Sequence, residues 1–128
     1  MDASAERGWQ HRELTQAIIG LCIDVARELG SGFLESVYHE ALIIAFQDAG
    51  IHATSEPEIP VFFRGKKVGC YVPDFVVAES VVLELKAVQT LATEHQAQVI
   101  NALAAIKKNV GLLVNFGTHR LQIKRCFR

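Results

Sequence analysis

The sequence predicts a single domain of the mixed α/β class (α/β or α+β), in which a mixed β-sheet is flanked by helices. Three observations predict this class: two segments with helical periodicity open the chain, a series of short apolar strands follows, and a third helical segment separates these strands from two more. The predicted order of elements is ααβββ(β)αββ. Of the 128 residues, 50% are hydrophobic, so we expect residues 1–128 to bury one core as one domain.

The first two predicted helices lie at the beginning of the chain. Residues 9–29 form the first, whose apolar side chains recur at helical spacing. These side chains are Leu14, Ile18, Leu21, Cys22, Val25 and Leu29. Gly30 is expected to end this helix in a left-handed conformation, and Ser31 can start the next one. The second helix is predicted over residues 33–49 and ends at Gly50. Its apolar stripe comprises Leu34, Val37, Ala41, Leu42 and Ala45.

From residue 51 the sequence changes to short strands. Strands are predicted over residues 58–63, 68–71, 74–77 and 81–86. A hairpin-type turn at residues 64–67 joins the first two, and a turn at residues 79–80 joins the last two. Pro60 indicates an edge strand or a strand start, because proline has no N–H to donate to a neighbouring strand.

The last part of the chain contains one more helix and two more strands. The helix is predicted over residues 93–108, and the strands over residues 111–116 and 121–127. The apolar residues of this helix are Ala97, Ile100, Leu103, Ala104 and Ile106.

Composition excludes several classes of protein. A charged fraction of 21% and a mean hydropathy of +0.21 exclude a disordered chain. No apolar run approaches the roughly 18 residues that span a bilayer, and the polar N-terminal segment is unlike a signal peptide, so we expect a cytoplasmic protein without membrane contact. Cys22, Cys70 and Cys126 form no CxxC pair, so we expect them to be small buried residues in a reducing compartment.

Charge is distributed unevenly along the chain. Residues 1–60 contain ten acidic and three basic residues (−7), whereas residues 61–128 contain four acidic and ten basic residues (+6). This segregation indicates either a basic surface for an anionic partner or a chance difference between helices and strands. The basic side chains form either a rim that contacts phosphates or ordinary solvated strand faces. They are Arg64, Lys66, Lys67, Arg120, Lys124, Arg125 and Arg128.

The most informative pattern is Pro73-Asp74 followed, after nine residues, by Glu84-Leu85-Lys86. Side chains alternate along a strand, so Glu84 and Lys86 share a face, and the apolar residues before them indicate a strand covered on both faces. If Asp74 lies on the neighbouring strand of a hairpin, its carboxylate faces Glu84. Two carboxylates and one lysine leave a negative charge that a divalent cation with oxygen ligands would balance. The alternative is a structural ion pair between Glu84 and Lys86 on a solvated face.

These residues resemble the motif of the PD-(D/E)xK nuclease superfamily. The segment GFLESVY at residues 32–38 is similar to the motif that names the small GxxExxY proteins of that superfamily. The segment VGLLVNFG at residues 110–117 is similar to a strand of the same family. The resemblance extends over about residues 14–125 and implies a restriction-endonuclease-like core.

The resemblance implies a role for each residue of the motif. Asp74 and Glu84 would bind Mg²⁺ (or Mn²⁺) together with the backbone carbonyl of Leu85. Glu35 would be a further ligand, directly or through water. Lys86 would lie beside the attacking water, where its charge acts on the water or on the scissile phosphate.

Three further residues near this motif have more than one interpretation. Gln98 would match a substrate-positioning glutamine of exonuclease-type members, which usually carry an aromatic residue where this chain has Ala102. Tyr38 is interpreted either as substrate-positioning, through a hydroxyl near the site, or as a core residue. His39 shares a helix face with Glu35 and is interpreted as a metal ligand or as an ordinary hydrogen-bonding residue.

The resemblance implies a metal-dependent nuclease, an enzyme that hydrolyses phosphodiester bonds in nucleic acid, DNA in particular. We expect no membrane partner, and a homodimer is one assembly open to the chain. The alternative is a catalytically weak or inactive nuclease fold that binds nucleic acid or protein. The net charge of −1 favours this alternative more than a basic chain would.

Overall fold

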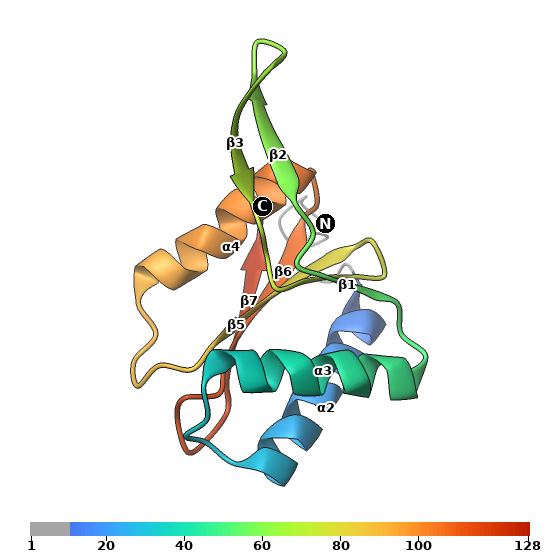
Figure 1. Cartoon of the computed structure of the whole chain (residues 1–128), viewed down its shortest axis with the longest axis vertical. Helices are drawn as coiled ribbons and strands as arrows, with labels where there is room; N and C mark the ends of the chain where they lie inside the picture. Colours follow the sequence, from blue (N-terminus) through green and yellow to red (C-terminus); the bar gives the residue numbers. More distant parts are fainter. Residues whose placement is uncertain (1–10) are drawn as a thin grey trace, which may run out of the picture.

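The computed structural model describes residues 11–128, which fold into three helices and seven strands. In chain order, with the labels of Figure 1, the elements are α2 (Arg12–Leu29), α3 (Glu35–Ala49), β1 (Ala53–Ser55), β2 (Ile59–Phe63), β3 (Lys66–Tyr71), β4 (Phe75–Val77), β5 (Val81–Lys86), α4 (Thr93–Ile106), β6 (Val110–Asn115) and β7 (Gln122–Phe127). The start of the first predicted helix, including Trp9, lies outside the described residues.

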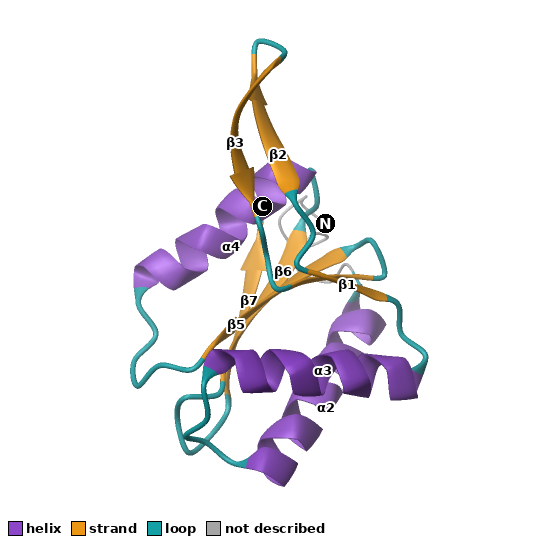
Figure 2. Cartoon of the chain, viewed as in Figure 1, coloured by secondary structure: helices purple, strands orange, loops and turns teal. Residues whose placement is uncertain are grey.

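Five of the strands form one mixed sheet in the order β1-β4-β5-β6-β7. β5 and β6 run parallel and are joined through α4, whereas the other neighbours in this sheet are antiparallel. α2 and α3 pack on one face of the sheet and α4 packs on the other (Figure 2). The predicted fold, a mixed sheet flanked by helices, is confirmed.

The remaining two strands, β2 and β3, form a separate hairpin that projects from the body (Figure 1). Its turn has positive φ at both central residues, 51° at Arg64 and 76° at Gly65, which is the backbone of a type I′ turn. Pro60 pairs with Cys70 in this two-stranded sheet, where both strands are edges. The predicted hairpin turn and the edge position of Pro60 are therefore confirmed.

Central strand β5 is buried on both faces along most of its length. Leu83 and Leu85 are 0% exposed and lie in the larger core, with side chains from α2 and α3. Val82 points to the opposite face and lies in the smaller core under α4. On that second face the next two alternating residues are Glu84 and Lys86, which are only half-buried. The strand therefore changes from apolar to ionisable along one face only.

The buried stripe of α3 differs from the predicted one. Tyr38, His39, Leu42 and Phe46 are buried, whereas Leu34, at 77% exposed, points to solvent. α3 carries apolar residues on two sides, so periodicity alone did not select the side that α2 and the sheet cover. Its start also differs, because no side chain caps α3, which excludes the expected role of Ser31.

The covered side of α4 is likewise set by packing. Val99, Ala102 and Leu103 are its buried residues, and of these only Leu103 is among the apolar residues that the sequence singled out. Ala97, Ile100 and Ala104, which the sequence also singled out, are exposed. Here too small and apolar residues occur around most of the helix, and only packing against the sheet decides which of them are covered.

Helix ends and one strand complete the corrections. Gly30 has a positive φ of 76° but a ψ of 178°, so the chain leaves α2 extended and not in the expected left-handed helical conformation. Gly50 does end α3 in the left-handed conformation, as predicted. β1 was not predicted, because the strand has only three residues and most of them are polar. It is recognisable only through its pairing with β4.

All three cysteines are free thiols. Cys22 and Cys126 are buried, as predicted, and burial raises the pKa of the Cys22 thiol to about 12. Cys70 lies on the hairpin and is exposed, so the prediction was wrong there. None of the helices in the described part of the chain is long and apolar enough to cross a bilayer.

Candidate active site

Strand pairing brings the separated parts of the sequence pattern together. β4 runs antiparallel to β5 with Phe75 opposite Leu83, so Asp74, one residue before β4, lies beside Glu84 near the end of β5. The alternation that buries Leu83 and Leu85 against α2 and α3 turns Glu84 and Lys86 toward α4. The expected convergence of the carboxylates and the lysine is therefore observed.

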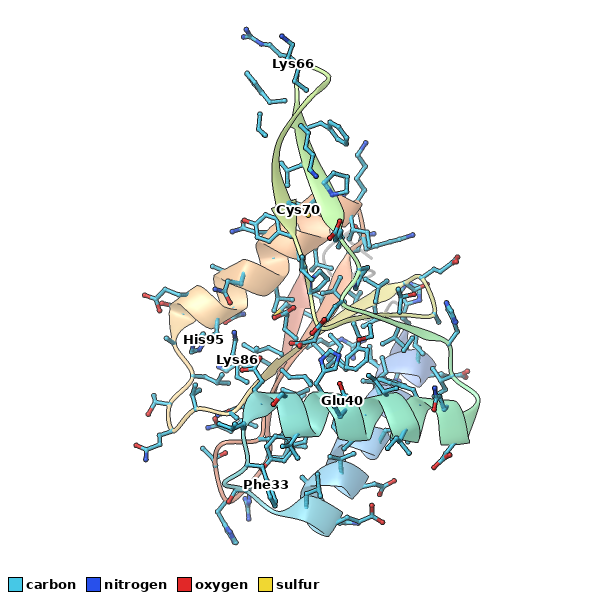
Figure 3. All side chains as sticks on the ribbon, viewed as in Figure 1. Phe33, Glu40, Lys66, Cys70, Lys86 and His95 are labelled. Carbon is cyan, nitrogen blue, oxygen red and sulfur yellow. The ribbon has the colours of Figure 1, made fainter. Side chains whose placement is uncertain are left out.

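These side chains line one cleft of about 350 Å³. The first turn of α3 contributes Glu35, α4 contributes Gln98 and Ala102, and the connection after β3 contributes part of the wall. The complete lining is Glu35, Tyr71, Val72, Pro73, Asp74, Glu84, Lys86, Gln98 and Ala102. In Figure 3, Lys86 lies between the beginning of α3 and the beginning of α4.

Backbone hydrogen bonds fix the two carboxylates of the motif. The backbone N–H of Asp74 donates to Oε1 of Glu84 over 2.8 Å. The backbone N–H of Leu85 donates to Oδ2 of Asp74, also over 2.8 Å. Each carboxylate is therefore tied to the strand that carries the other, while the Leu85 side chain remains in the opposite core.

His39 is a member of the site whose partners the sequence did not reveal. Its Nδ1 lies 2.9 Å from Oδ1 of Asp74, and because a carboxylate only accepts, Nδ1 carries the proton. Its Nε2 lies 2.7 Å from the hydroxyl of Ser55 on β1. The ring stacks on Phe75 at a centroid distance of 4.3 Å. These contacts hold the Asp74 carboxylate from the side opposite β5.

Burial and mutual repulsion alter the ionisation of two carboxyl groups in the cleft. Burial, and secondly the charge of Asp74, raises the pKa of Glu84 to about 7 despite the nearby Lys86 ammonium. The same two causes raise the pKa of Glu35 above its ordinary value. Burial is the larger cause for both groups, so these carboxyl groups are less solvated than those of a surface ion pair, and the charge of Asp74 adds repulsion.

The comparison with protein families agrees with this geometry. The family model described as "PD-(D/E)XK nuclease superfamily" matches residues 12–126. The chain belongs to this superfamily. In this chain, Asp74, Glu84 and Lys86 match the PD-(D/E)XK motif in residue type and in order. No curated protein sequence matches the chain.

Two solved structures have a similar fold. The crystal structure of SSO0001 superposes with a TM-score of 0.61 at 18% identity, over 96% of this chain and 61% of that one. An alkaline exonuclease from Laribacter hongkongensis superposes with a TM-score of 0.50 at 15% identity, over 70% of this chain and 53% of that one. The chain thus spans less than two thirds of the length of either structure, and these likenesses concern the fold alone.

The side chains of this cleft include oxygen ligands suited to a divalent cation. Glu35, Asp74 and Glu84 offer carboxylate oxygens, the ligands that Mg²⁺ and Mn²⁺ prefer. A cation would favour the charged forms of Glu35 and Glu84, whose pKa values are raised by burial and by repulsion from Asp74. Within residues 11–128, however, no group of three or more His, Cys, Asp and Glu side chains already stands in an arrangement that would hold a metal ion. Both oxygens of Asp74 and one of Glu84 accept hydrogen bonds from the protein instead.

Tyr38 does not reach the cleft, which corrects its interpretation as a substrate-positioning residue. The side chain is 0% exposed and stacks on Phe116 at 4.4 Å. Its hydroxyl donates to the carbonyl of Gly30 over 2.6 Å and accepts the N–H of Phe33 over 3.3 Å. Tyr38 therefore holds the loop before α3, and its hydroxyl bonds to backbone groups outside the cleft. Gln98, in contrast, does lie at the rim of the cleft.

Proposed function

We propose that this cleft hydrolyses phosphodiester bonds of nucleic acid, DNA in particular, with the help of a divalent metal ion. The observation that carries the proposal is the convergence of Glu35, Asp74, Glu84 and Lys86 in one cleft. Membership of the nuclease superfamily supports nucleic acid as the substrate. The raised pKa of Glu84 supports a site built for a cation, since a structural ion pair favours the charged carboxylate.

The carboxylates would hold the metal ion. Asp74 and Glu84, with the Leu85 carbonyl between them in the chain, are the proposed ligands, and Glu35 completes the set from α3. When bound, the ion supplies positive charge that stabilises the developing charge on the phosphate and acidifies water. His39 keeps the Asp74 carboxylate in place through Nδ1, so the ligand does not have to be ordered during binding.

Lys86 acts on the attacking water and on the phosphate. Its side chain shares the Glu84 face of β5 and reaches the cleft from a rigid central strand. An ammonium group has three donors and a flexible stem, so it can orient a water molecule and contact a phosphate oxygen. Gln98 at the opposite wall is placed to bind the substrate, and the small Ala102 leaves room beside it.

The test measures cleavage of labelled single-stranded and double-stranded DNA and RNA, with Mg²⁺ or Mn²⁺ and with EDTA. We expect hydrolysis that EDTA abolishes and that Lys86→Ala lowers about a hundredfold or more, the usual effect of removing a group that stabilises transition-state charge. Lys107→Ala, at an exposed lysine just after α4, is the matched control. Asp74→Asn should lose cleavage together with affinity for Mn²⁺, measured by calorimetry.

Two outcomes would contradict the proposal. Equal cleavage by the wild type and by Lys86→Ala would show that the activity belongs to a contaminant. Absence of cleavage for every substrate, with Mn²⁺ bound, would favour the alternative of a nuclease fold that binds without catalysis.

A further inference from the structure

The far part of the β2–β3 hairpin lies outside the proposed active site. It projects away from the helices and the main sheet (Figure 1), with Lys66 at its far end and Cys70 closer to the body (Figure 3). Only its base is anchored: Ile59 is 6% exposed and, with Tyr71, packs into the core under α4. A two-stranded hairpin alone is only marginally stable in water, so a projecting hairpin adds little to the stability of the fold.

Several large apolar side chains on this hairpin are exposed to solvent. Phe62 is 62% exposed, Phe63 is 60% exposed and Val68 is 63% exposed. Val72, in the connection that follows β3, is 54% exposed. Exposed apolar side chains grouped on one projecting element mark a surface that binds something.

The charge of the hairpin indicates what it binds. Residues 59–73 contain Arg64, Lys66 and Lys67 and no acidic residue, in a chain with a net charge of −1. Such a segment is complementary to a polyanion. A second copy of the chain carries ten acidic residues before residue 61, but an arm of aromatic and cationic residues matches both components of a nucleic-acid strand, bases and phosphates.

Strand register places one aromatic ring beside one lysine on each face of the hairpin tip. Phe62 lies opposite Lys67 and Phe63 lies opposite Lys66, and directly opposite residues of an antiparallel pair point to the same face. The guanidinium of Arg64 lies 4.9 Å from the centre of the Phe63 ring. Each face therefore combines an aromatic ring, on which a base could stack, with a cation that could contact the adjacent phosphate of the same strand.

The hairpin is also continuous with the proposed active site. Tyr71 ends β3 and Val72 follows it, and both residues line the cleft that contains Asp74 and Lys86. A strand of nucleic acid that leaves the cleft past these two residues meets the hairpin next. No separate domain is needed to extend the substrate contact.

We propose that the hairpin is an arm that binds an unpaired strand of nucleic acid next to the cleft. Phe62 and Phe63 stack on bases, while Arg64, Lys66 and Lys67 contact phosphates. The strand is unpaired because the bases of a duplex are already stacked on each other and offer no free face to these rings. The proposal rests on the proposed function, to which it adds the structural class of the substrate.

The experiment measures binding without catalysis. Fluorescence anisotropy in EDTA compares a labelled single-stranded oligonucleotide with the corresponding duplex, over a series of salt concentrations. The variants are Phe62→Ala and the double variant Lys66→Ala/Lys67→Ala. The matched control is Arg12→Ala/Arg27→Ala, which also removes two exposed positive charges, both on α2, the helix that packs on the face of the sheet opposite α4.

Each variant has a distinct expected result. Phe62→Ala should weaken single-strand binding roughly tenfold, the loss typical of one stacking ring, and leave duplex binding unchanged. Lys66→Ala/Lys67→Ala should reduce the slope of log K against log salt by about 1.4, as two lost phosphate contacts on a single strand predict. The control should change neither quantity. All substituted side chains are exposed, so far-ultraviolet circular dichroism should match the wild type.

Several results would overturn the inference. Unchanged affinity and salt slope in both hairpin variants would do so, as would an equal loss in the arginine control. A Phe62→Ala variant that binds single strands like the wild type but changes the sedimentation coefficient would identify the hairpin as a self-association surface instead. Hairpin-dependent binding by a wild type that never cleaves would support the arm while contradicting the proposed function, so the two failures are distinguishable.

Discussion

The two faces of strand β5 carry the same backbone but differ in what covers them. On the face toward α2 and α3, apolar side chains continue to Leu85, and the core is complete. On the face toward α4, cover ends after Val82, and Glu84 and Lys86 open into the cleft. The site therefore lies where the second layer stops, and the complete core behind it keeps the reactive groups on a rigid strand. Adjacent residues of β5 should consequently respond to mutation in opposite directions.

The largest expected effect on stability belongs to the covered face. Leu83 is 0% exposed in the larger core, so Leu83→Ala leaves a cavity there. We expect the free energy of unfolding to fall by about 2–5 kcal/mol. Urea denaturation followed by circular dichroism measures it. A loss below about 1 kcal/mol would show that this core is loosely packed and that the two faces do not differ as argued.

Glu84→Gln, one residue away, should raise the free energy of unfolding, the opposite of the effect of Leu83→Ala. Folding raises the pKa of this carboxyl from its ordinary 4.5 to about 7, so the folded state binds the proton more tightly than the unfolded state. The wild type therefore loses stability as pH rises through this window, up to about 3 kcal/mol. The amide does not ionise, and its oxygen can still accept the Asp74 N–H. The variant should therefore be more stable than the wild type above about pH 7.

Denaturation in EDTA at about pH 5 and about pH 8 separates these cases. The advantage of Glu84→Gln should be small at the lower pH and largest at the higher one. Added Mg²⁺ should stabilise the wild type at the higher pH and stabilise the variant less. A variant that is less stable than the wild type at the higher pH would instead indicate a structural ion pair between Glu84 and Lys86.

A smaller effect is expected from His39, which supports the open face from the side. His39→Gln removes the ring that bonds Asp74 and Ser55 and stacks on Phe75. Loss of a residue that orients a metal ligand typically lowers metal affinity about tenfold or more, so Mn²⁺ binding should weaken by that factor. Calorimetry with Mn²⁺ measures it, and His52→Gln, at an exposed histidine, is the control. Equal Mn²⁺ affinity in both variants would exclude this positioning role.

The strands that build the site were predictable because local sequence patterns, alternation and turns, indicate them. Alternation along β5 placed Glu84 and Lys86 on one face, and the turn before β5 brought Asp74 beside them, as the pairing of β4 with β5 confirms. The buried faces of α3 and α4 were not predictable, because both helices carry apolar residues on more than one side. There the choice depends on which neighbours cover the helix, which is a property of tertiary packing.

The hydrogen bonds around Asp74 depend on residues that are far apart in the chain. His39 contacts Asp74 over a separation of 35 residues and Ser55 over 16, and Ser55 belongs to a strand too short to predict. The available signal was the spacing between Glu35 and His39, which share a face of α3. That spacing shows a histidine near the site but not its partners.

The smallest expected effect comes from Tyr38, which lies on the covered side of the molecule. Tyr38→Phe removes the hydroxyl that bonds the Gly30 carbonyl and the Phe33 N–H but keeps the ring stacked on Phe116. We expect a loss of about 1 kcal/mol in the free energy of unfolding, since hydrogen bonds contribute about that much each and the loop can recruit water. Nucleic-acid affinity in EDTA should stay at the wild-type value, because the hydroxyl does not face the cleft. A variant with wild-type stability and weakened nucleic-acid binding would restore Tyr38 as a substrate-positioning residue and show that the loop before α3 opens toward the substrate.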